Sequence, residues 1–284
     1  MSAQVFRAVR DRLRSRRAPI AEDHGGGPSN SELHVWLRIP HILDAICAYV
    51  NDDSSLARLA RVCRAFNEPA LSVLYAHIED ILLFLQCLPR DLWTIKGLKK
   101  YKKYKELRFR RKMTQRDWDI FAVKAARVKA LGPPLSNPYR GLHCAPRYDN
   151  DPTGVLFVPH DSVLDALTKR PIPILFPNLR VLTGALPNPL FSALLSPQLR
   201  HLDVTHENME VFLNNEPSLP VLCPSIESLH ILTFTGDVEK PFPTPRFIPQ
   251  WSSLRSLTGS FCVDSALLDY LRGCQNLDKL ELFP

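Results

Sequence analysis

The chain has 284 residues, is 45% apolar, and carries 36 Lys and Arg against 29 Asp and Glu. This composition excludes an intrinsically disordered protein, and 11 Gly without a regular period exclude a collagen-like fibre. The seven Cys include no C-x-x-C pair, which indicates reduced thiols in a cytoplasmic or nuclear protein rather than a disulfide scaffold.

The net charge of +7 comes from two short segments. Residues 96–112 contain ten basic side chains and one acid, which gives +9, and residues 1–30 contribute +3. The rest of the chain therefore carries −5. The sequence describes a mildly acidic body with two basic segments, not a wholly basic surface.

Residues 1–32 are expected to be a disordered basic tail and linker. The Gly/Pro/Ser cluster at 25–30 has the composition of a flexible connection. The Arg-rich residues 1–17 also resemble a mitochondrial presequence, which is the alternative interpretation. No apolar run reaches the roughly 18 residues needed to cross a membrane, so no membrane span is predicted.

A helical module is predicted over residues 33–93. Pro40 suits the first turn of a helix, and apolar residues then recur at helical spacing to about residue 50. A second helix is expected over 56–66, a third after Pro69, and a fourth over 78–88. Helices this short are not stable singly, so they must pack together and against a partner.

The residues of this module resemble an F-box, on the segments 39–46, 56–66 and 69–75. The resemblance is to a large fungal F-box group in which leucine-rich repeats follow the module. It covers roughly residues 35–284 and includes Thr114, Asp117, Trp118 and Phe121. Two positions depart from the family pattern: His41 stands where an acid is usual, and Tyr75 where Trp is usual.

The resemblance implies binding to the Skp-type adaptor of a cullin-RING ubiquitin ligase. The adaptor-binding residues that it implies are Ile39, Pro40, Ile42, Leu43, Ile46, Leu56, Val62, Cys63 and Phe66. The alternative is a helical cap that only seals the end of a repeat array. An apolar-proline corner before the first helix favours the adaptor, because a cap has no need for one.

Five later segments share one pattern of leucines. The first leucine-type position of each copy is followed by a second one three residues later, and successive copies are 20, 27, 28 and 23 residues apart. This spacing is typical of leucine-rich repeats. The copies are 176–182, 196–204, 223–231, 251–257 and 274–282, with weaker ones at 104–109 and 128–131.

The pattern predicts an α/β solenoid over residues 94–284, with a curved parallel sheet and helices on its outer side, so that the chain as a whole is α+β or α/β. Loops are expected at 132–153 and, as an extended crossover, at 237–249. The chain stops at Pro284 directly after a predicted strand, so the array is expected to be truncated or its last strand covered by another element. The helical returns are expected at 115–129, 161–169, 190–195, 207–214 and 264–272.

Side chains between the leucines should point away from the core and bind a protein substrate. The basic segment 96–112 is open to three interpretations: a nucleic-acid site, a nuclear localisation signal, or a solvated stretch. As a positive rim of the repeat face it favours an acidic or phosphorylated substrate. The substrate-binding residues predicted in this way are Arg108, Arg110, Val181, Thr183, His201, Asp203, Ser228, His230, Ser256, Thr258, Lys279 and Glu281.

No catalytic constellation is present in the sequence. The glycines at 25–27 lack the Lys-Ser/Thr of a P-loop, and there is no H-E-x-x-H or G-x-S-x-G. His201 and His230 fall in adjacent repeats, but no third ligand is expected near them. We therefore predict no enzyme activity, no metal and no cofactor.

Overall fold

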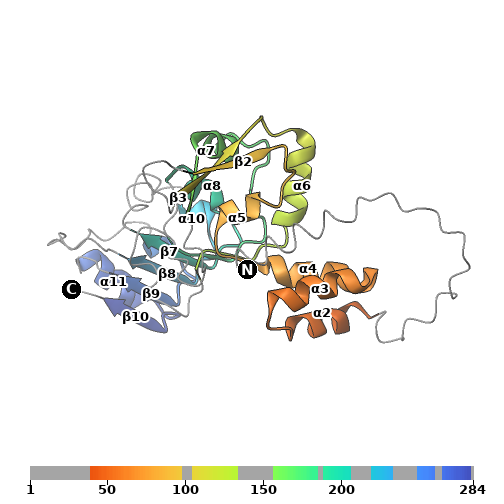
Figure 1. Cartoon of the computed structure of the whole chain (residues 1–284). Helices are drawn as coiled ribbons and strands as arrows, with labels where there is room; N and C mark the ends of the chain where they lie inside the picture. Colours follow the sequence, from red (N-terminus) through yellow and green to blue (C-terminus); the bar gives the residue numbers. More distant parts are fainter. Residues whose placement is uncertain are drawn as a thin grey trace, which may run out of the picture. The chain divides into compact units, whose positions relative to one another are not determined.

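The computed structural model describes residues 39–97, 104–133, 156–184, 188–205, 219–232, 248–259 and 264–282 (Figure 1). The chain divides into two compact units, Met1–His77 and Ile78–Pro284. The boundary between them lies about sixteen residues before the predicted one at 93/94.

The described part of the first unit, from residue 39 on, contains three helices: α2 (Pro40–Ala48), α3 (Asp53–Val62) and α4 (Arg64–Ala76). Pro40 begins α2, as the sequence predicts, because a first-turn residue needs no backbone N–H. The carboxylate of Asp52 caps α3 by accepting a hydrogen bond from the Ser55 amide at 2.7 Å. Both α2 and α3 pack on α4, and the buried residues include Leu43, Cys47, Leu56, Ala60, Phe66 and Ala70.

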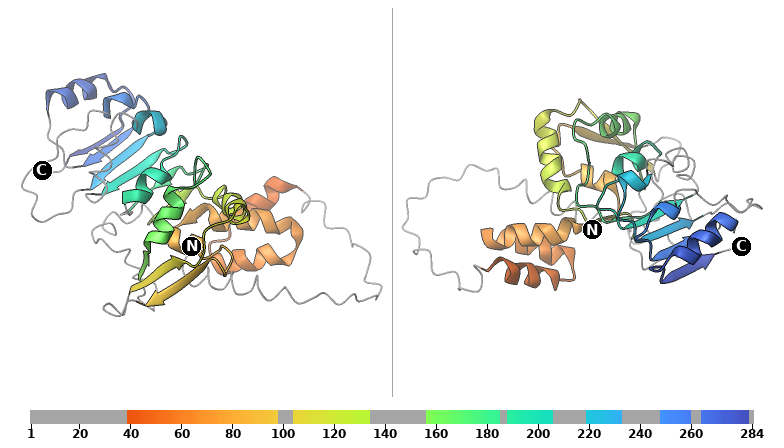
Figure 2. Two further views of the ribbon diagram at one scale, coloured as in Figure 1. Left: turned by 90° about the horizontal axis from the view of Figure 1, so that it is seen from above. Right: turned by 180° about the vertical axis from the view of Figure 1, so that it is seen from behind.

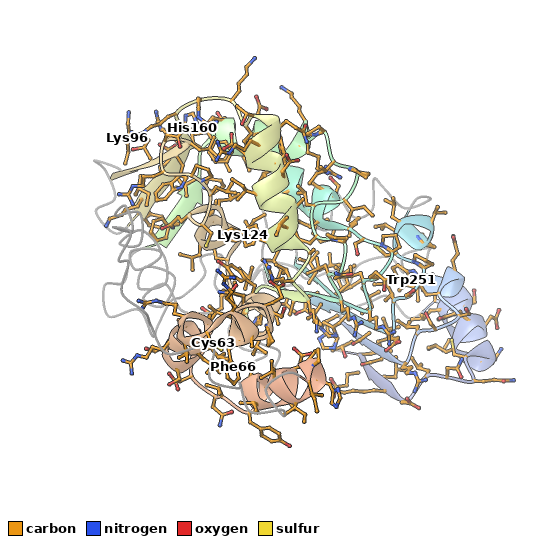
Figure 3. The ribbon with its side chains drawn as sticks, turned by 90° about the vertical axis from the view of Figure 1, so that its right-hand side faces the viewer. Cys63, Phe66, Lys96, Lys124, His160 and Trp251 are labelled. Carbon is orange, nitrogen blue, oxygen red and sulfur yellow. The ribbon has the colours of Figure 1, made fainter. Side chains whose placement is uncertain are left out.

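The break between the second and third helices differs from the prediction. α3 ends at Val62, and Cys63 is extended, with φ −152° and ψ 168°. α4 then runs through Pro69, although the sequence predicted a new helix only after this proline. A proline inside a helix removes one backbone hydrogen bond, but the buried face formed by Phe66 and Ala70 keeps the helix continuous. Cys63 and Phe66, which are labelled in Figure 3, come just before and just after Arg64, the first residue of α4.

The second unit is built on a seven-stranded sheet with the strand order β1-β4-β6-β7-β8-β9-β10. The pairs from β4 to β10 are all parallel, and Figure 2 shows β7 to β10 side by side. The predicted α/β architecture with a parallel sheet is therefore confirmed. The strands are β1 (His77–Ile78), β4 (Ala130–Leu131), β6 (Val181–Leu182), β7 (His201–Thr205), β8 (Ser228–Leu232), β9 (Ser256–Gly259) and β10 (Lys279–Leu282).

The register of this sheet follows the leucine pattern. The second leucine of each copy lies opposite that of the next strand, through Leu182, Leu202, Leu229, Leu257 and Leu280. The first four of these side chains are at most 1% exposed, whereas Leu280 on the edge strand β10 is 43% exposed. Alternation along each strand then places the intervening polar residues on the opposite face.

Helices connect the strands at most of the predicted places. Predicted helices correspond to α6 (Gln115–Ala125), α7 (Asp161–Thr168), α8 (Asn188–Leu194) and α11 (Ser265–Gly273). The helix predicted over 78–88 is present in a shorter form as α5 (Ile81–Leu85). Two short elements were not predicted: α10 (Leu219–Leu222) and the 3-10 turn η4 (Ile248–Gln250). The predicted helix at 207–214 and most of the loops at 132–153 and 237–249 lie outside the described residues.

A second, three-stranded sheet corrects the prediction for the basic segment. β3 (Tyr104–Phe109) pairs antiparallel with β2 (Trp93–Gly97) and parallel with β5 (Leu156–Pro159). It is therefore not the first strand of the seven-stranded sheet. Leu107 is buried as expected. The alternation of apolar and polar residues along β3 is, however, compatible with any sheet that is buried on one face.

Aromatic packing explains why residues 78–93 belong to the second unit and not to the helical module. All five residues of α5 are buried. Phe84 contacts the rings of Phe121 and Phe176 edge to face, with centroid distances of 5.3 and 5.4 Å. Helical spacing predicted the helix but could not show which partner its apolar side chains would meet.

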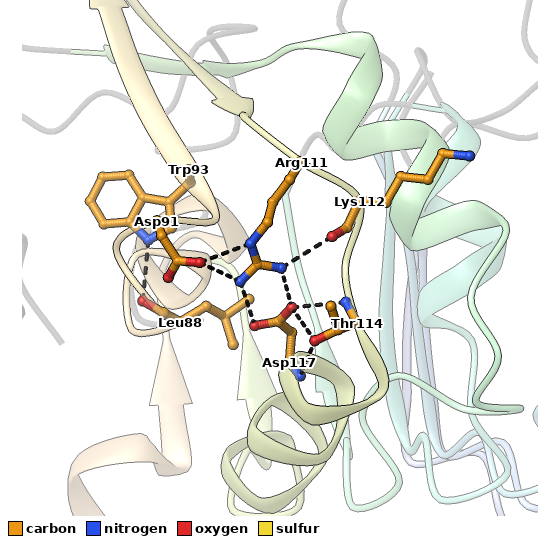
Figure 4. A network of polar contacts seen from close by, with 7 residues as sticks. All are labelled: Leu88, Asp91, Trp93, Arg111, Lys112, Thr114 and Asp117. Carbon is orange, nitrogen blue, oxygen red and sulfur yellow. Dashed lines mark hydrogen bonds and ion pairs between the residues drawn. The ribbon is translucent and has the colours of Figure 1, made fainter.

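A polar network joins the β2–β3 hairpin to α6 (Figure 4). Arg111 donates hydrogen bonds to both carboxylate oxygens of Asp117 and forms an ion pair with Asp91 at 2.7 Å. Asp117 also forms a capping box with Thr114 at the start of α6. These ion pairs use Arg111, one of the ten positive charges in residues 96–112, for folding.

Candidate functional site

The polar face of the seven-stranded sheet is the first candidate site. Strand register places its side chains in two rows that run across the strands. One row contains His201, and the other contains Asp203. We define the polar face by its partly or fully exposed members: His201, Asp203, Ser228, His230, Ser256, Lys279 and Glu281. Val181 begins the first row opposite His201 and is half-buried.

Three polar-face residues lie in contact at the centre of the sheet. His201 Nε2 is 2.9 Å from Asp203 Oδ1, and His230 Nδ1 is 3.4 Å from the same oxygen. The two imidazole rings lie edge to face with centroids 4.8 Å apart. The side chains of His201 and Asp203 are each 12% exposed, and that of His230 is 28% exposed.

This contact follows from the strand geometry. His201 and Asp203 are two residues apart on β7, so both side chains leave the same face. Asp203 lies directly opposite His230 of β8, which makes His230 the diagonal neighbour of His201. The sequence placed all three residues on this face but missed that Asp203 joins the two histidines. The signal was the His-x-Asp spacing with a second His one strand later.

The electrostatics at His230 are mixed. Burial lowers the pKa of its imidazole below the ordinary value, while the neighbouring Asp203 carboxylate acts in the opposite direction. Lys279 and Glu281 also act on His230 with opposite signs, and these two side chains form an ion pair at 3.1 Å. A neutral His230 imidazole is thus favoured by its surroundings.

Two predicted surface residues, Thr183 and Thr258, are instead buried, with 3% and 5% exposure. Thr183 Oγ1 donates a hydrogen bond to the Pro133 carbonyl oxygen at 2.7 Å, so this side chain belongs to the junction with β4. Thr258 lies opposite His230, and its buried hydroxyl has no hydrogen-bond partner among the residues that the structure describes. Neither side chain is accessible to a large partner.

Arg108 and Arg110 do not belong to the polar face, because β3 lies in the three-stranded sheet. Arg108 forms an ion pair with Glu106 at 2.6 Å, and Arg110 donates a hydrogen bond to Thr94 at 3.4 Å. The predicted positive rim beside the polar face is therefore wrong. With Arg108 and Arg111 both paired to carboxylates, the described part of the basic segment offers fewer free charges to nucleic-acid phosphates.

The helical unit provides the second candidate site. Its exposed apolar side chains are Ile46 (39%), Tyr49 (85%) and Val62 (71%). At 3.6 residues per turn, Ile42, Ile46 and Tyr49 form a stripe along one side of α2, away from the buried Leu43 and Cys47. We call Ile42, Ile46 and Tyr49 the α2 stripe.

The predicted adaptor-binding residues fall into two groups. Leu43, Leu56 and Phe66 are at most 9% exposed, which corrects their assignment to a binding surface: they are core residues. Ile39, Ile42 and Cys63 are half-buried, whereas Pro40, Ile46 and Val62 are exposed. Tyr49 was missed, although it continues the spacing of Ile42 and Ile46 by one further helical turn.

A scan against protein-family models, a search of curated proteins and a search of solved structures each found no match. Within the described ranges, no helix has the length and apolarity to cross a membrane. In the same part of the chain, His201, Asp203 and His230 are the one group of three potential metal ligands. The candidate sites are thus defined by their chemistry alone.

Proposed function

We propose that the protein is the substrate-recognition subunit of an SCF-type cullin-RING ubiquitin ligase. In this role the helical unit is an F-box that binds the Skp-type adaptor, and the second unit is a leucine-rich repeat region whose polar face binds a protein substrate. The chain itself performs no bond chemistry. It raises the local concentration of the substrate near the ligase.

The observation that carries this proposal is the α2 stripe. Exposed Ile46 and Tyr49 lie on a small unit whose core is already filled by Leu43, Cys47 and Leu56. Large apolar side chains that remain outside a complete core are typical of a protein interface. The stripe lies on the helix that starts at the Ile39-Pro40 corner, which is also the start of the segment 39–46 that resembles an F-box.

The polar face supports the second half of the proposal. Parallel strands present their side chains in regular rows, which suits the recognition of an extended protein surface. The polar face contains imidazole, carboxylate, hydroxyl and ammonium groups within a few strands. Without Arg108 and Arg110, no preference for acidic or phosphorylated substrates is retained.

Two variants of the helical unit test adaptor binding. Ile46→Glu, and the double variant Pro40→Ala with Ile42→Glu, replace apolar contacts by a charge. Each buried aliphatic side chain contributes about 1.5–3 kcal/mol, so we expect the Kd for a Skp-type adaptor to rise roughly 10- to 100-fold or more. Surface plasmon resonance with the purified full chain measures this change.

Val123→Glu is the matched control, because Val123 is 62% exposed on a helix of the second unit. It should leave adaptor affinity unchanged. Unaltered adaptor binding by Ile46→Glu and by the double variant, or no adaptor binding by the wild-type chain, contradicts the proposal. Circular dichroism must show that the variants retain their helices.

A further inference from the structure

Two imidazole nitrogens and one carboxylate oxygen meet at the centre of the polar face. His201 Nε2 and His230 Nδ1 lie 2.9 and 3.4 Å from Asp203 Oδ1, and the three ligand atoms are all within 4.8 Å of one another. Each of the three atoms offers a lone pair when the carboxyl is ionised and each neutral imidazole carries its proton on the other ring nitrogen, Nδ1 of His201 and Nε2 of His230. Their positions are set by two paired strands, which are rigid supports for a binding site.

The spacing fits a tetrahedral metal ion. Ligand bonds of about 2.0–2.1 Å from Zn²⁺ to nitrogen and oxygen require ligand atoms about 3.3 Å from each other. The two distances to Asp203 Oδ1 bracket this value. The third distance, between His201 Nε2 and His230 Nδ1, is at most 4.8 Å, so the two imidazoles must approach each other by side-chain rotation when the ion binds.

The surroundings also favour binding. His201 and Asp203 are 12% exposed, so bulk water competes little for their ligand atoms, while His230, at 28%, keeps an opening to solvent. Thr258 lies opposite His230 on β9, and its buried hydroxyl has no hydrogen-bond partner among the described residues, which leaves an unsatisfied polar group next to the site.

We propose that His201, Asp203 and His230 form a binding site for Zn²⁺ on the polar face. Two nitrogen ligands disfavour Ca²⁺ and Mg²⁺, which prefer oxygen ligands throughout. Three protein ligands leave one of the four tetrahedral positions open, for a water molecule or for a side chain of a bound protein. The site does not depend on the F-box proposal, because all of its ligands belong to the seven-stranded sheet.

Isothermal titration of the chelator-treated full chain with ZnCl₂ provides the first test. We expect a tight site for one ion per chain, and no heat from MgCl₂ or CaCl₂ at the same concentrations. Asp203→Asn and His230→Ala should each weaken Zn²⁺ binding by at least about 100-fold, more than the loss of an outer hydrogen-bond partner produces. His41→Ala, which changes an exposed histidine of the helical unit, should bind Zn²⁺ like the wild type.

Cysteine binding is the competing explanation, because Cys63, Cys87 and Cys274 are partly exposed. X-ray absorption spectroscopy of the Zn²⁺-loaded wild-type chain distinguishes cysteine ligands from the proposed histidine and aspartate ligands without any variant. The site requires nitrogen and oxygen neighbours only, with the multiple-scattering pattern of imidazole. Sulfur neighbours, absence of Zn²⁺ binding, or full-strength binding by Asp203→Asn and His230→Ala would each overturn the proposal, whatever the result of the adaptor experiment.

Discussion

At the residue scale, Asp117 joins three neighbouring parts of the second unit. Its carboxylate accepts hydrogen bonds from Arg111, from the backbone amide of Thr114 and from the Thr114 hydroxyl. The side chain is 3% exposed, so none of these bonds is easily replaced by water. Asp117 therefore holds the end of the β2–β3 hairpin on the first turn of α6.

Replacing Asp117 by Asn tests this role. Asn keeps the shape of the side chain but removes the charge that pairs with Arg111. Its NH₂ group cannot accept the hydrogen bonds that Arg111 and Thr114 donate to the carboxylate of Asp117. We expect the free energy of unfolding to fall by about 1–3 kcal/mol, as measured by urea denaturation. Asp119→Asn is the control, since Asp119 is exposed on the same helix and accepts from Gln115 alone among the contacts described. An equal effect of both variants would contradict the role assigned to Asp117.

The same carboxylate predicts a pH dependence. The hydrogen bonds from Arg111 hold the pKa of Asp117 well below its ordinary value. Asp117 therefore binds a proton less readily in the folded than in the unfolded chain. Its stabilising contribution is complete above the unfolded pKa of about 3.9 and is lost as the pH falls further.

We expect the stability difference between the wild type and Asp117→Asn to be constant from neutral pH to about pH 5 and to shrink below about pH 4. Urea denaturation at a series of pH values measures this difference. A difference that grows on acidification would have the wrong sign and would refute the assignment. Because both proteins share every other carboxyl group, the comparison isolates Asp117.

At the scale of elements, the junction between β4 and β6 depends on one glycine. Gly132 has φ +108°, a conformation that side chains disfavour. A Cβ atom at this position would lie 2.0 Å from the carbonyl oxygen of Thr183. The Thr183 amide donates to the Leu131 carbonyl oxygen at 2.9 Å, so the clash falls on the residue that makes this hydrogen bond.

Gly132→Ala should therefore destabilise the second unit by about 1–3 kcal/mol, through strain and the loss of this pairing. Thermal unfolding followed by circular dichroism measures the effect. Gly97→Ala serves as the control, because no atom from elsewhere in the described part of the chain lies within 4 Å of a Cβ built there. If Gly132→Ala were as stable as Gly97→Ala, the close approach of β4 and β6 would be wrong.

Elements with their own repeated pattern were predictable, and the others were not. The strands at Val181, His201, Ser228, Ser256 and Lys279 each follow a leucine-type residue by two positions, so the sequence showed both the strand and its register. The sequence of β3 also alternates between apolar and polar residues, with Leu107 buried between Glu106 and Arg108. This alternation does not show which strand will pair with β3. Its partners β2 and β5 lack the leucine pattern of the repeats. The pairing of such strands depends on tertiary structure.

At the scale of the whole molecule, the two units carry two different kinds of surface. The helical unit exposes apolar Ile46 and Tyr49, whereas the sheet of the second unit exposes the polar face around His201. An adaptor and a substrate, as we propose them, would thus use separate compact units of one chain. Changes in the α2 stripe should leave Zn²⁺ binding intact, and changes at His230 should leave adaptor binding intact.

The sequence alone determined the parallel strands from Val181 onward, their register, and the alternation that puts His201, Asp203 and His230 on one face of the sheet. These features depend on the periodicity of apolar residues, which can be recognised in the sequence itself. Tertiary structure decided what depends on proximity between distant segments. It buried Leu43, Thr183 and Thr258, moved Arg108 to another sheet, and brought Asp203 between His201 and His230. The pattern of a strand predicts which face of the sheet each side chain lies on. Only the pairing of strands determines which side chains then contact each other.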